Sequence, residues 1–383
     1  MKKFTTQLLL LAFIIFPLVL FPQTKPYVHF NEDDGLAGNK VMSILKDREG
    51  YMWIGTDNGL SKYDGSKFTN FRKADGLAGN RVWALATDGK RIYVGCYKDG
   101  LAIIENNKVT GVYHFNSKFP NSIRRLHYSD FYKMLIVGTD YGIYLFKDSV
   151  FYEIRYEKDL EFYSNPNRTD SARKSSILGI VEYKNQIFFT SHTNVMRGGV
   201  FKMVINKLNP LLSKVQRIDR LNDNKFSLAV INDTIYAGSY FKIDTYPIST
   251  LNEKQIIFND HKFFLPWAAC PISNNEILLG GFGEGIFICD LIVYNTKTGT
   301  LRRFPYNINP ISINDLFYDS ANNLTWVCSD NGLFCLMKTD FNVIDLPKTD
   351  GLIDVASREE NLYILTKSEL IVIKGDKIDQ TIP

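Results

Sequence analysis

The sequence predicts an all-β fold, a β-propeller of seven or eight four-stranded blades, and two observations support this prediction. The first is an internal repeat: DGLAGNKV at residues 34–41 returns as DGLAGNRV at residues 75–82, and a period of about 40–45 residues is typical of propellers. The second is the pattern inside the repeat, where short apolar runs alternate with tight turns, as at residues 57–59. Four short antiparallel strands of this kind make one propeller blade.

The expected elements follow the repeat along the chain. Residues 27–30 read as a strand with no repeat before it, and closed rings often complete their final blade with such a strand from the other terminus. Eight leading strands are expected after it, each followed by a hairpin: residues 41–45, 82–86, 123–127, 177–181, 226–231, 267–272, 313–318 and 353–356. Polar insertions at residues 157–176 and 207–224 read as surface loops. The sequence leaves open whether eight blades form one ring or seven blades precede the first unit of a further repeat.

The first residues indicate export. Lys2 and Lys3 precede an apolar run at residues 8–21 that Pro17 interrupts, and a basic start before so short a run favours a secretory signal over a membrane span. We therefore expect a signal peptide at residues 1–22 and a propeller at residues 27–383, in a periplasmic or extracellular location. An uncleaved signal anchor is the alternative.

The composition bounds the class of function. The 383 residues are 45% hydrophobic and 22% charged, which is typical of a globular protein. Because 45 basic and 41 acidic residues leave a net charge of only +4, the sequence gives no reason to expect a nucleic-acid partner.

Four of the five cysteines lie in apolar strand-like runs, so buried, reduced thiols are the simplest interpretation. If Asn331 and Gly332 formed a two-residue loop, Cys328 would face Cys335, and a disulfide would be an alternative in an oxidising compartment. Directly opposed strand residues are poorly placed for a relaxed disulfide.

The first repeat resembles the two-component regulator propeller repeat. The resemblance rests on Asp34-Gly35-Leu36, Asn39, Val41, Asp47, Gly50, Trp53-Ile54-Gly55-Thr56, Gly59-Leu60 and Tyr63-Asp64-Gly65. It implies the periplasmic region of a sensor histidine kinase, in which an immunoglobulin-like domain, a membrane helix and the kinase follow downstream. Many such sensors respond to breakdown products of polysaccharides. None of the downstream parts is in this sequence, so the resemblance implies the N-terminal ligand-sensing part of a longer protein, without enzyme activity of its own.

No constellation of residues predicts catalysis, a metal site or a cofactor. The carboxylates Asp57, Asp140 and Asp330 recur at hairpin turns, where Asp commonly hydrogen-bonds its own backbone. A glycosidase pair would need two carboxylates facing one cleft about 5–9.5 Å apart, and recurrence from blade to blade favours a structural role.

A ligand is expected at the mouth of the ring, where the blade-linking loops meet the starts of the innermost strands. The candidate ligand-binding residues at that register are Asn39, Lys40, Asn80, Arg81, Trp83, Arg124, Arg125, Trp267 and Asn314. Arg124 and Arg125 lie in or beside a strand expected to line the channel, where charge is costly unless it is paired or hydrated. They favour a polar or anionic ligand, and the alternative is a hydrated channel with structural polar groups.

Three functions fit these predictions. The first is an exported sensor propeller that binds a glycan-derived or other polar small molecule. Its kinase module would follow in the same polypeptide, and the sequence leaves open whether the protein forms a homodimer. The second is a stand-alone exported propeller that acts as a protein-interaction scaffold in a secretion or surface complex. An enzyme, such as a lyase or hydrolase, ranks last because no group of residues supports it.

Overall fold

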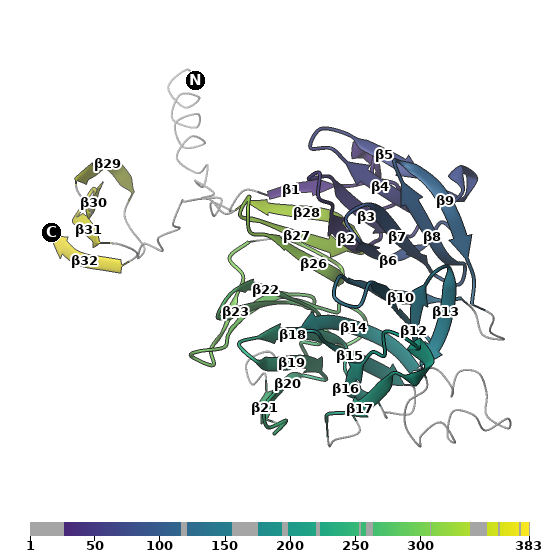
Figure 1. The fold of residues 1–383 in the computed structure, drawn as a ribbon. Coiled ribbons are helices and arrows are strands. Elements are labelled where there is room, and N and C mark those ends of the chain that lie inside the picture. Colours follow the sequence, from purple (N-terminus) through teal and green to yellow (C-terminus); the bar gives the residue numbers. More distant parts are fainter. Residues whose placement is uncertain are drawn as a thin grey trace. The chain divides into compact units, whose positions relative to one another are not determined.

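The computed structural model describes residues 27–115, 121–154, 175–193, 198–219, 223–252, 254–257, 263–306, 308–337, 351–358, 361–374 and 377–382. These residues form eight four-stranded antiparallel sheets. The prediction of an all-β propeller is therefore confirmed (Figure 1). The signal peptide expected at residues 1–22 lies outside the described residues.

Seven of the sheets belong to one unit, residues 27–337, and surround a common axis as blades 1 to 7 (Figure 1). Blade 1 is β2 (Val41–Lys46), β3 (Met52–Thr56), β4 (Gly59–Tyr63) and β5 (Phe68–Phe71), and blade 2 is β6 (Val82–Thr87), β7 (Arg91–Cys96), β8 (Gly100–Glu105) and β9 (Lys108–Tyr113). Blade 3 is β10 (Ile123–Ser129), β11 (Met134–Thr139), β12 (Gly142–Lys147) and β13 (Val150–Ile154). Blade 4 is β14 (Ser175–Tyr183), β15 (Gln186–Thr193), β16 (Gly199–Val204) and β17 (Lys214–Arg217).

The remaining blades follow the same order from the innermost strand outward. Blade 5 is β18 (Ser227–Ile231), β19 (Thr234–Ser239), β20 (Lys242–Pro247) and β21 (Lys254–Ile257), and blade 6 is β22 (Pro266–Ser273), β23 (Glu276–Gly281), β24 (Leu291–Asn295) and β25 (Leu301–Arg303). Blade 7 is β26 (Ile313–Asp319), β27 (Leu324–Ser329), β28 (Gly332–Met337) and β1 (Tyr27–Phe30).

Strand β1 closes the ring, as the sequence predicted. It pairs antiparallel with β28, with Tyr27 opposite Leu336 and Phe30 opposite Leu333. His29 adds a stacking contact with Phe334, with ring centroids 4.2 Å apart. Blade 7 is therefore built from both ends of the ring sequence, which removes the open sheet edge that β28 would otherwise present.

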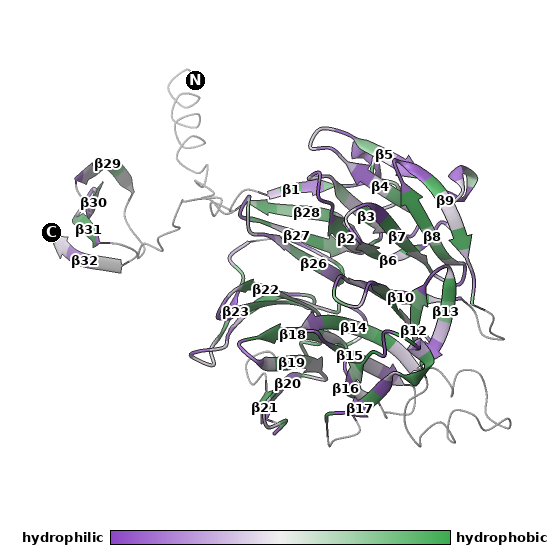
Figure 2. Cartoon of the chain, in the orientation of Figure 1, coloured by the Kyte–Doolittle hydropathy of each residue, from purple (hydrophilic) through white to green (hydrophobic). Residues whose placement is uncertain are grey.

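The core lies between successive blades. Trp53 and Leu60 of blade 1 and Val94 and Ile104 of blade 2 belong to one buried cluster, and equivalent clusters join the other pairs of neighbours. Because both faces of a blade pack against neighbours, its middle strands are apolar on both sides. Figure 2 shows this for β8 and β28.

The repeated Asp-Gly-Leu sequences form the loops that enter blades 1 and 2. Each contains a 3₁₀ turn, η1 (Glu32–Asp34) or η2 (Lys73–Asp75), which ends at a glycine with positive φ, 99° at Gly35 and 101° at Gly76. A carboxylate closes each turn: Asp34 accepts the backbone N–H of Asn31 at 2.9 Å. Glycine suits this position because residues with a Cβ rarely adopt that backbone conformation.

The hairpin register differs from the one expected. Ser329 pairs with Gly332, so Asp330 and Asn331 form the loop and Gly332 takes the positive φ of 122°. Cys328 therefore faces Leu333, and Cys335 faces Trp326. The interpretation that would place the two thiols opposite each other is wrong, and all five cysteines are free.

The insertion at residues 207–224 is only partly a loop. It contains η4 (Pro210–Leu212) and β17, the outermost strand of blade 4. The expected surface loop is therefore wrong for residues 214–217, where a polar edge strand hides its periodicity. Most of the other insertion, residues 157–174, lies outside the described residues.

The eighth sheet belongs to a separate unit that includes residues 338–383. It consists of β29 (Leu352–Arg358), β30 (Asn361–Thr366), β31 (Leu370–Lys374) and β32 (Lys377–Ile382). Its inner strand carries the same register shift as the blades of the ring, between Leu352 and Asp354. Within the described ranges, no helix is long and apolar enough to cross a membrane.

Candidate ligand site at the mouth of the ring

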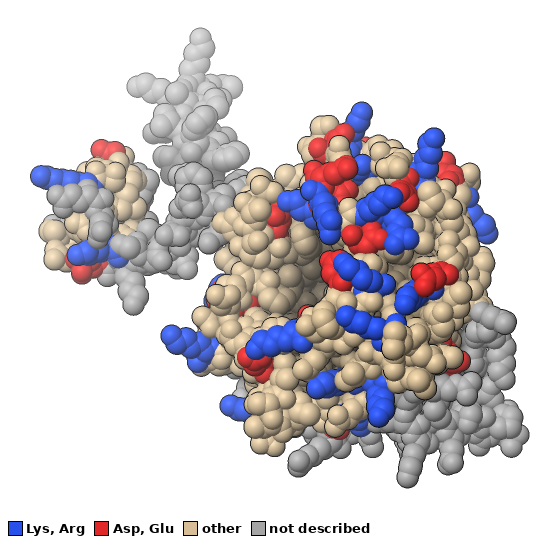
Figure 3. Space-filling view, in the orientation of Figure 1, with Lys and Arg blue, Asp and Glu red and all other residues tan. Residues whose placement is uncertain are grey.

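A cavity of about 300 Å³ lies on the axis of the ring. All seven innermost strands line it, through Ser43, Trp83, Ala84, Leu85, Arg125, Leu126, Leu178, Gly179, Ile180, Val181, Ser227, Leu228, Ala229, Val230, Trp267, Ala268, Ala269, Cys270, Pro271 and Asp315. Figure 3 shows one face of the molecule hollowed near the middle of the ring. We call the end at which the innermost strands begin the mouth. Because strands alternate in direction, the blade-linking loops and the turns between second and third strands all lie there.

Two charged side chains face this otherwise mostly apolar cavity. The Arg125 guanidinium of blade 3 donates to the carbonyl oxygen of Leu178 at 2.8 Å and to that of Asn314 in blade 7 at 3.3 Å. Asp315 accepts the backbone N–H groups of Ile44 and Leu316, at 3.3 and 3.1 Å. Burial raises the pKa of Asp315, and the positive charge of Arg125 opposes that shift. A concave site with a few convergent polar groups is typical of small-molecule binding.

A β-bulge shapes the mouth in six of the seven blades. The pairing of the innermost strand with its neighbour skips one residue near its start, namely Met42, Trp83, Arg124, Leu178, Trp267 and Asn314. A bulge re-aims the extra side chain. Four of the nine predicted site residues are bulge residues. The repeat therefore identified the correct positions in the innermost strands, but it did not show that a bulge is present there.

Carboxylates of the second turn hold the bulge residues in blades 3 and 7. Asp140 accepts Arg124 Nε at 2.5 Å and, from the next blade, the hydroxyl of Ser176 at 2.8 Å. Asp330 accepts hydrogen bonds from Asn314 Nδ2 and from Lys40 Nζ, both at 2.7 Å. Lys40 lies in the loop that leads into the next blade. We call this arrangement the turn clasp. Each carboxylate thus links its own blade to the next one, a contact that the sequence did not predict.

Blade 2 has an aromatic pair in place of the clasp. The ring of Trp83 stacks on that of Tyr97, with centroids 4.0 Å apart and planes 16° apart. The Arg124 guanidinium lies 4.2 Å from the Trp83 ring centroid. Trp83 remains half-buried, so the pair forms part of the surface at the mouth.

Blades 5 and 6 contribute further aromatic side chains to the mouth. The ring of Trp267 lies 5.5 Å from Phe226 and 4.9 Å from Phe282. Phe282 and Phe287 belong to residues 282–290, a turn longer than its counterparts in blades 1 and 7. Aromatic groups therefore border both parts of the mouth. They lie beside arginines in blades 2 and 3 and beside the Asp223–Lys242 pair in blade 5.

Other predicted residues have structural partners. Asn39 and Asn80 lie outside the cavity, where their amide oxygens accept the backbone N–H groups of Glu32 and Lys73 at the starts of η1 and η2. Asn314 is only 5% exposed. Of the nine, Trp83, Arg125 and Trp267 line the cavity, and Arg81 and Arg124 adjoin it through the aromatic pair.

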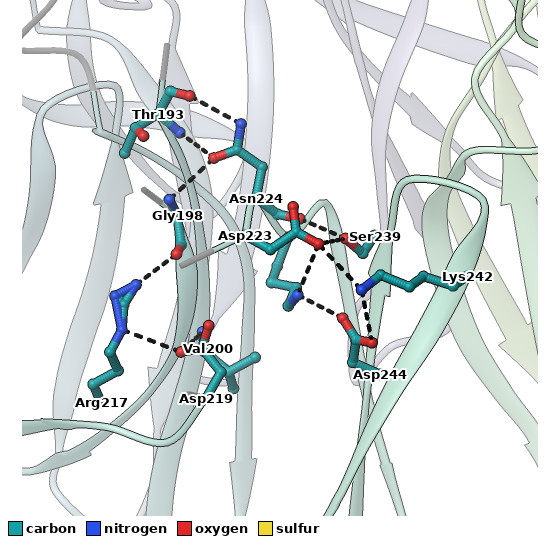
Figure 4. Close-up of polar contacts among 11 residues, drawn as sticks. Thr193, Gly198, Val200, Arg217, Asp219, Asp223, Asn224, Ser239, Lys242 and Asp244 are labelled. Atoms are coloured by element: carbon teal, nitrogen blue, oxygen red, sulfur yellow. Dashed lines mark hydrogen bonds and ion pairs between the residues drawn. The ribbon is translucent and has the colours of Figure 1, made fainter. Parts of the chain in front are cut away.

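A second polar cluster joins blades 4 and 5 (Figure 4). The side chains of Lys225 and Asp244 are both fully buried and form an ion pair at 2.5 Å. Lys242 lies 3.3 Å from both Asp223 and Asp244. Asn224 accepts the backbone N–H of Thr193 at 2.9 Å (Figure 4). The cluster fixes the loop between the two blades.

Asp219 belongs to the same cluster and has a shifted proton affinity. It accepts the backbone N–H of Val200 at 3.0 Å, and Arg217 Nε lies 3.4 Å from the same oxygen. Burial raises the pKa of Asp219 to about 6, against the opposing effect of Arg217. Among the described residues, no group of three or more His, Cys, Asp or Glu side chains could hold a metal ion.

Sequence reasoning missed Tyr97, Lys98 and Asp315. One signal was present for the first two: the turn that reads Thr-Asp-Asn-Gly at residues 56–59 reads Cys-Tyr-Lys-Asp-Gly at residues 96–100. Tyr97 therefore stands where Asp57, Asp140 and Asp330 recur. A departure from a repeat, rather than the repeat itself, marks the distinctive part of the mouth.

Comparison with known proteins agrees with this architecture. Residues 35–58 match the family model described as two component regulator propeller. The chain carries a two-component regulator propeller repeat. No curated protein matches the chain.

Solved structures with the same fold include proteins from three different settings. The extracellular domain of the putative hybrid two-component system BT4673 from B. thetaiotaomicron is 18% identical, with a TM-score of 0.62, and the match covers 94% of this chain and 47% of that one. PorZ, a surface component of the type-IX secretion system of Porphyromonas gingivalis, is 13% identical with a TM-score of 0.64, over 92% and 54%. A catalytically inactive virginiamycin B lyase from Staphylococcus aureus is 13% identical with a TM-score of 0.60, over 82% and 99%. The chain thus spans about half the length of the first two proteins.

Proposed function

We propose that this chain is an exported propeller module of a two-component sensor and that a polar small molecule, such as a glycan fragment, binds at its mouth. The cavity on the ring axis carries the proposal, because all seven innermost strands line it. A ligand there would touch several blades at once. Binding would favour one arrangement of the blades and pass to the rest of the receptor as a shift between conformations.

The sensor role extends beyond this chain. The repeat at residues 35–58 and the fold shared with the extracellular domain of a hybrid two-component system support it. In this proposal the eighth sheet is the first blade of a further repeat array, and a kinase module follows in the same polypeptide. The chain itself is non-enzymatic, and a homodimer is compatible with the proposal. Sequencing the native gene past codon 383 tests it, since a stop codon there would remove the kinase.

A binding screen tests the ligand site. Thermal shift and calorimetry on the whole chain would use neutral and acidic oligosaccharides, with Arg125→Gln as the site variant. Lys108→Gln, in the exposed outer strand of blade 2, is the matched control. We expect a ligand that stabilises the protein and Lys108→Gln but not Arg125→Gln. Ligands that bind all three equally would exclude the cavity as their site.

The second candidate is a scaffold in a secretion or surface complex, because PorZ shares the fold with a TM-score of 0.64. Affinity purification from the native cell envelope separates the two functions. A stoichiometric protein complex that survives Arg125→Gln, together with no small-molecule binding, would favour the scaffold.

A further inference from the structure

In blade 2 no carboxylate occupies the position that the turn clasp uses in blades 3 and 7, and the carboxylate of Asp99, two residues on, lies against Gly79. In blades 3 and 7, Asp140 and Asp330 each bind the bulge residue of their own blade and a side chain leading into the next. Tyr97 takes that position in blade 2 and stacks on the bulge residue Trp83. The aspartate of blade 1 does not compensate, because the Asp57 carboxylate lies against Gly38.

Three cations gather where this carboxylate is missing. Arg81, Arg124 and Lys98 lie 4.9, 5.1 and 5.4 Å from the centroid of the Tyr97 ring. Asp140 neutralises Arg124. In the part of the chain that the structure describes, Arg81 and Lys98 form no ion pair with a carboxylate. Asp99 lies in the same turn, but its carboxylate lies against Gly79 and forms no ion pair with either cation. Both cations can therefore bind the anionic group of a ligand.

The exposure of the two cations leaves this turn open to a ligand. Lys98 lies in the turn between β7 and β8 with a φ of 70°, as several other turn residues of the protein do. Both Arg81 and Lys98 are exposed, so a ligand can reach them.

We propose that this corner of the mouth, formed by Arg81, Trp83, Tyr97 and Lys98, binds a carboxylate carried on a ring. The Trp83–Tyr97 pair packs against the flat face of the ring, while Arg81 and Lys98 take the place of the protein cations that elsewhere hold an aspartate. The inference rests on the proposed function, that the mouth takes a small ligand, and it adds the ligand's charge. A uronic-acid sugar and an aromatic acid share this chemistry.

Calorimetry on the full chain tests the proposal with two matched pairs of probes. Galacturonate is compared with galactose, and 4-hydroxybenzoate with phenol. We expect the acid of at least one pair to bind about tenfold or more tightly than its neutral partner, and we expect raised salt to weaken the difference because the site is exposed. The pair that shows the preference identifies the source of the ring.

Three variants separate the anion site from general electrostatics. Arg81→Gln/Lys98→Gln should remove the preference for the acid. Tyr97→Asp should do the same, because it restores the carboxylate found at Asp140 and Asp330 and therefore keeps a turn that the repeat already supports. Lys73→Gln/Lys108→Gln removes the same charge from exposed positions in or leading into the same blade and should leave the preference intact. Circular dichroism melts confirm that each variant folds.

The outcomes distinguish this proposal from the function on which it rests. Equal affinity for acid and neutral partner, or a preference that survives in Arg81→Gln/Lys98→Gln, overturns the anion site. If neutral sugars then bind and Arg125→Gln abolishes that binding, the proposed ligand-binding function stands without the anion site. Failure of both acids to bind at millimolar concentration also overturns the anion site, whatever the wider screen finds.

Discussion

The carboxyl group of Asp219 links stability to pH. Its pKa is raised to about 6 in the folded protein because the side chain is buried, whereas an Asp in an unfolded chain titrates near pH 3.9. Between these values the folded state holds a proton that the unfolded state has lost. The free energy of unfolding therefore falls as pH rises through this window and levels off above pH 6, by about 2–3 kcal/mol in total.

Asp219→Asn should remove this contribution. We expect urea unfolding between about pH 4 and 7 to show a shallower fall in stability for the variant than for the parent protein. Asp130→Asn is the control, because Asp130 is 68% exposed in its pair with Lys133. If Asp219→Asn leaves the pH dependence unchanged, the pKa of Asp219 is not raised, and Arg217 and the backbone N–H of Val200 offset the effect of its burial.

The buried pair of Lys225 and Asp244 gives a second prediction. Both side chains are fully buried, and removing one partner of such a pair typically costs about 3–5 kcal/mol because the other charge is left buried. Lys242 lies 3.3 Å from Asp244 and compensates in part, so we expect Lys225→Met to lose about 3 kcal/mol.

A double-mutant cycle measures this coupling. Lys225→Met/Asp244→Asn leaves no buried charge at either position, so denaturant melts should show less destabilisation than the sum of the two single variants. Strict additivity would mean that the two groups do not interact energetically.

The sequence predicted a residue of the mouth correctly where its position in the repeat alone places its side chain in the cavity. It was less successful where the direction of the side chain depends on hydrogen bonds to nearby groups. Trp83 and Arg125 lie in the cavity because the start of each innermost strand could be located from the repeat. Asn39 and Asn80 occupy the same loops but turn outward to cap η1 and η2. That difference depends on which backbone donor is within reach, and spacing alone does not contain it.

Ring closure by β1 is the feature of a single element with the largest consequence. Deleting residues 27–30 would expose the edge of β28, whose Leu333, Phe334, Cys335 and Leu336 pair with β1. We expect a melting temperature lower by several degrees and concentration-dependent oligomers, because an open strand edge pairs with other chains. Light scattering and thermal melts measure both effects.

Deleting β32, residues 377–382, is the matched control. That strand belongs to the eighth sheet rather than to the ring, so the ring's melting transition should stay where it is. A ring that is equally stable with and without β1 would show that the other six blades hold blade 7 in place alone.

Strand existence was predictable throughout, whereas register and bulges were not. The alternation of apolar runs and turns identified the leading strand of each sheet. The sequence could not show that Asp330 and Asn331 form the loop and Gly332 follows it, because Asn-Gly also fits a two-residue hairpin turn. The bulges at Trp83 and Arg124 left no separate mark in the sequence, since one skipped residue does not disturb a repeat of this length.

At the scale of the whole molecule, the sequence left two arrangements open. Either all eight blades form one ring, or seven blades form the ring and the eighth begins a further repeat. Seven sheets, closed by β1, form one unit, and the eighth sheet lies in the other. The sequence could not decide because the eighth unit has the same strand pattern and the same bulge. Closure depends on the strand that pairs with β28, and that strand is the four residues of β1.

This division predicts that the ring is stable on its own. A chain that ends at Met337 should keep the melting temperature of the ring within about one degree, because no described strand after Met337 pairs with a strand of the ring. The shorter chain should also keep any ligand affinity at the mouth. The eighth sheet should behave differently: Ile353, Val355, Leu365 and Ile382 are each more than 40% exposed, and a lone blade with apolar surface is prone to associate. Differential scanning calorimetry of the full chain and of residues 27–337 compares them directly. A drop of several degrees in the shorter chain would show that the eighth sheet stabilises the ring.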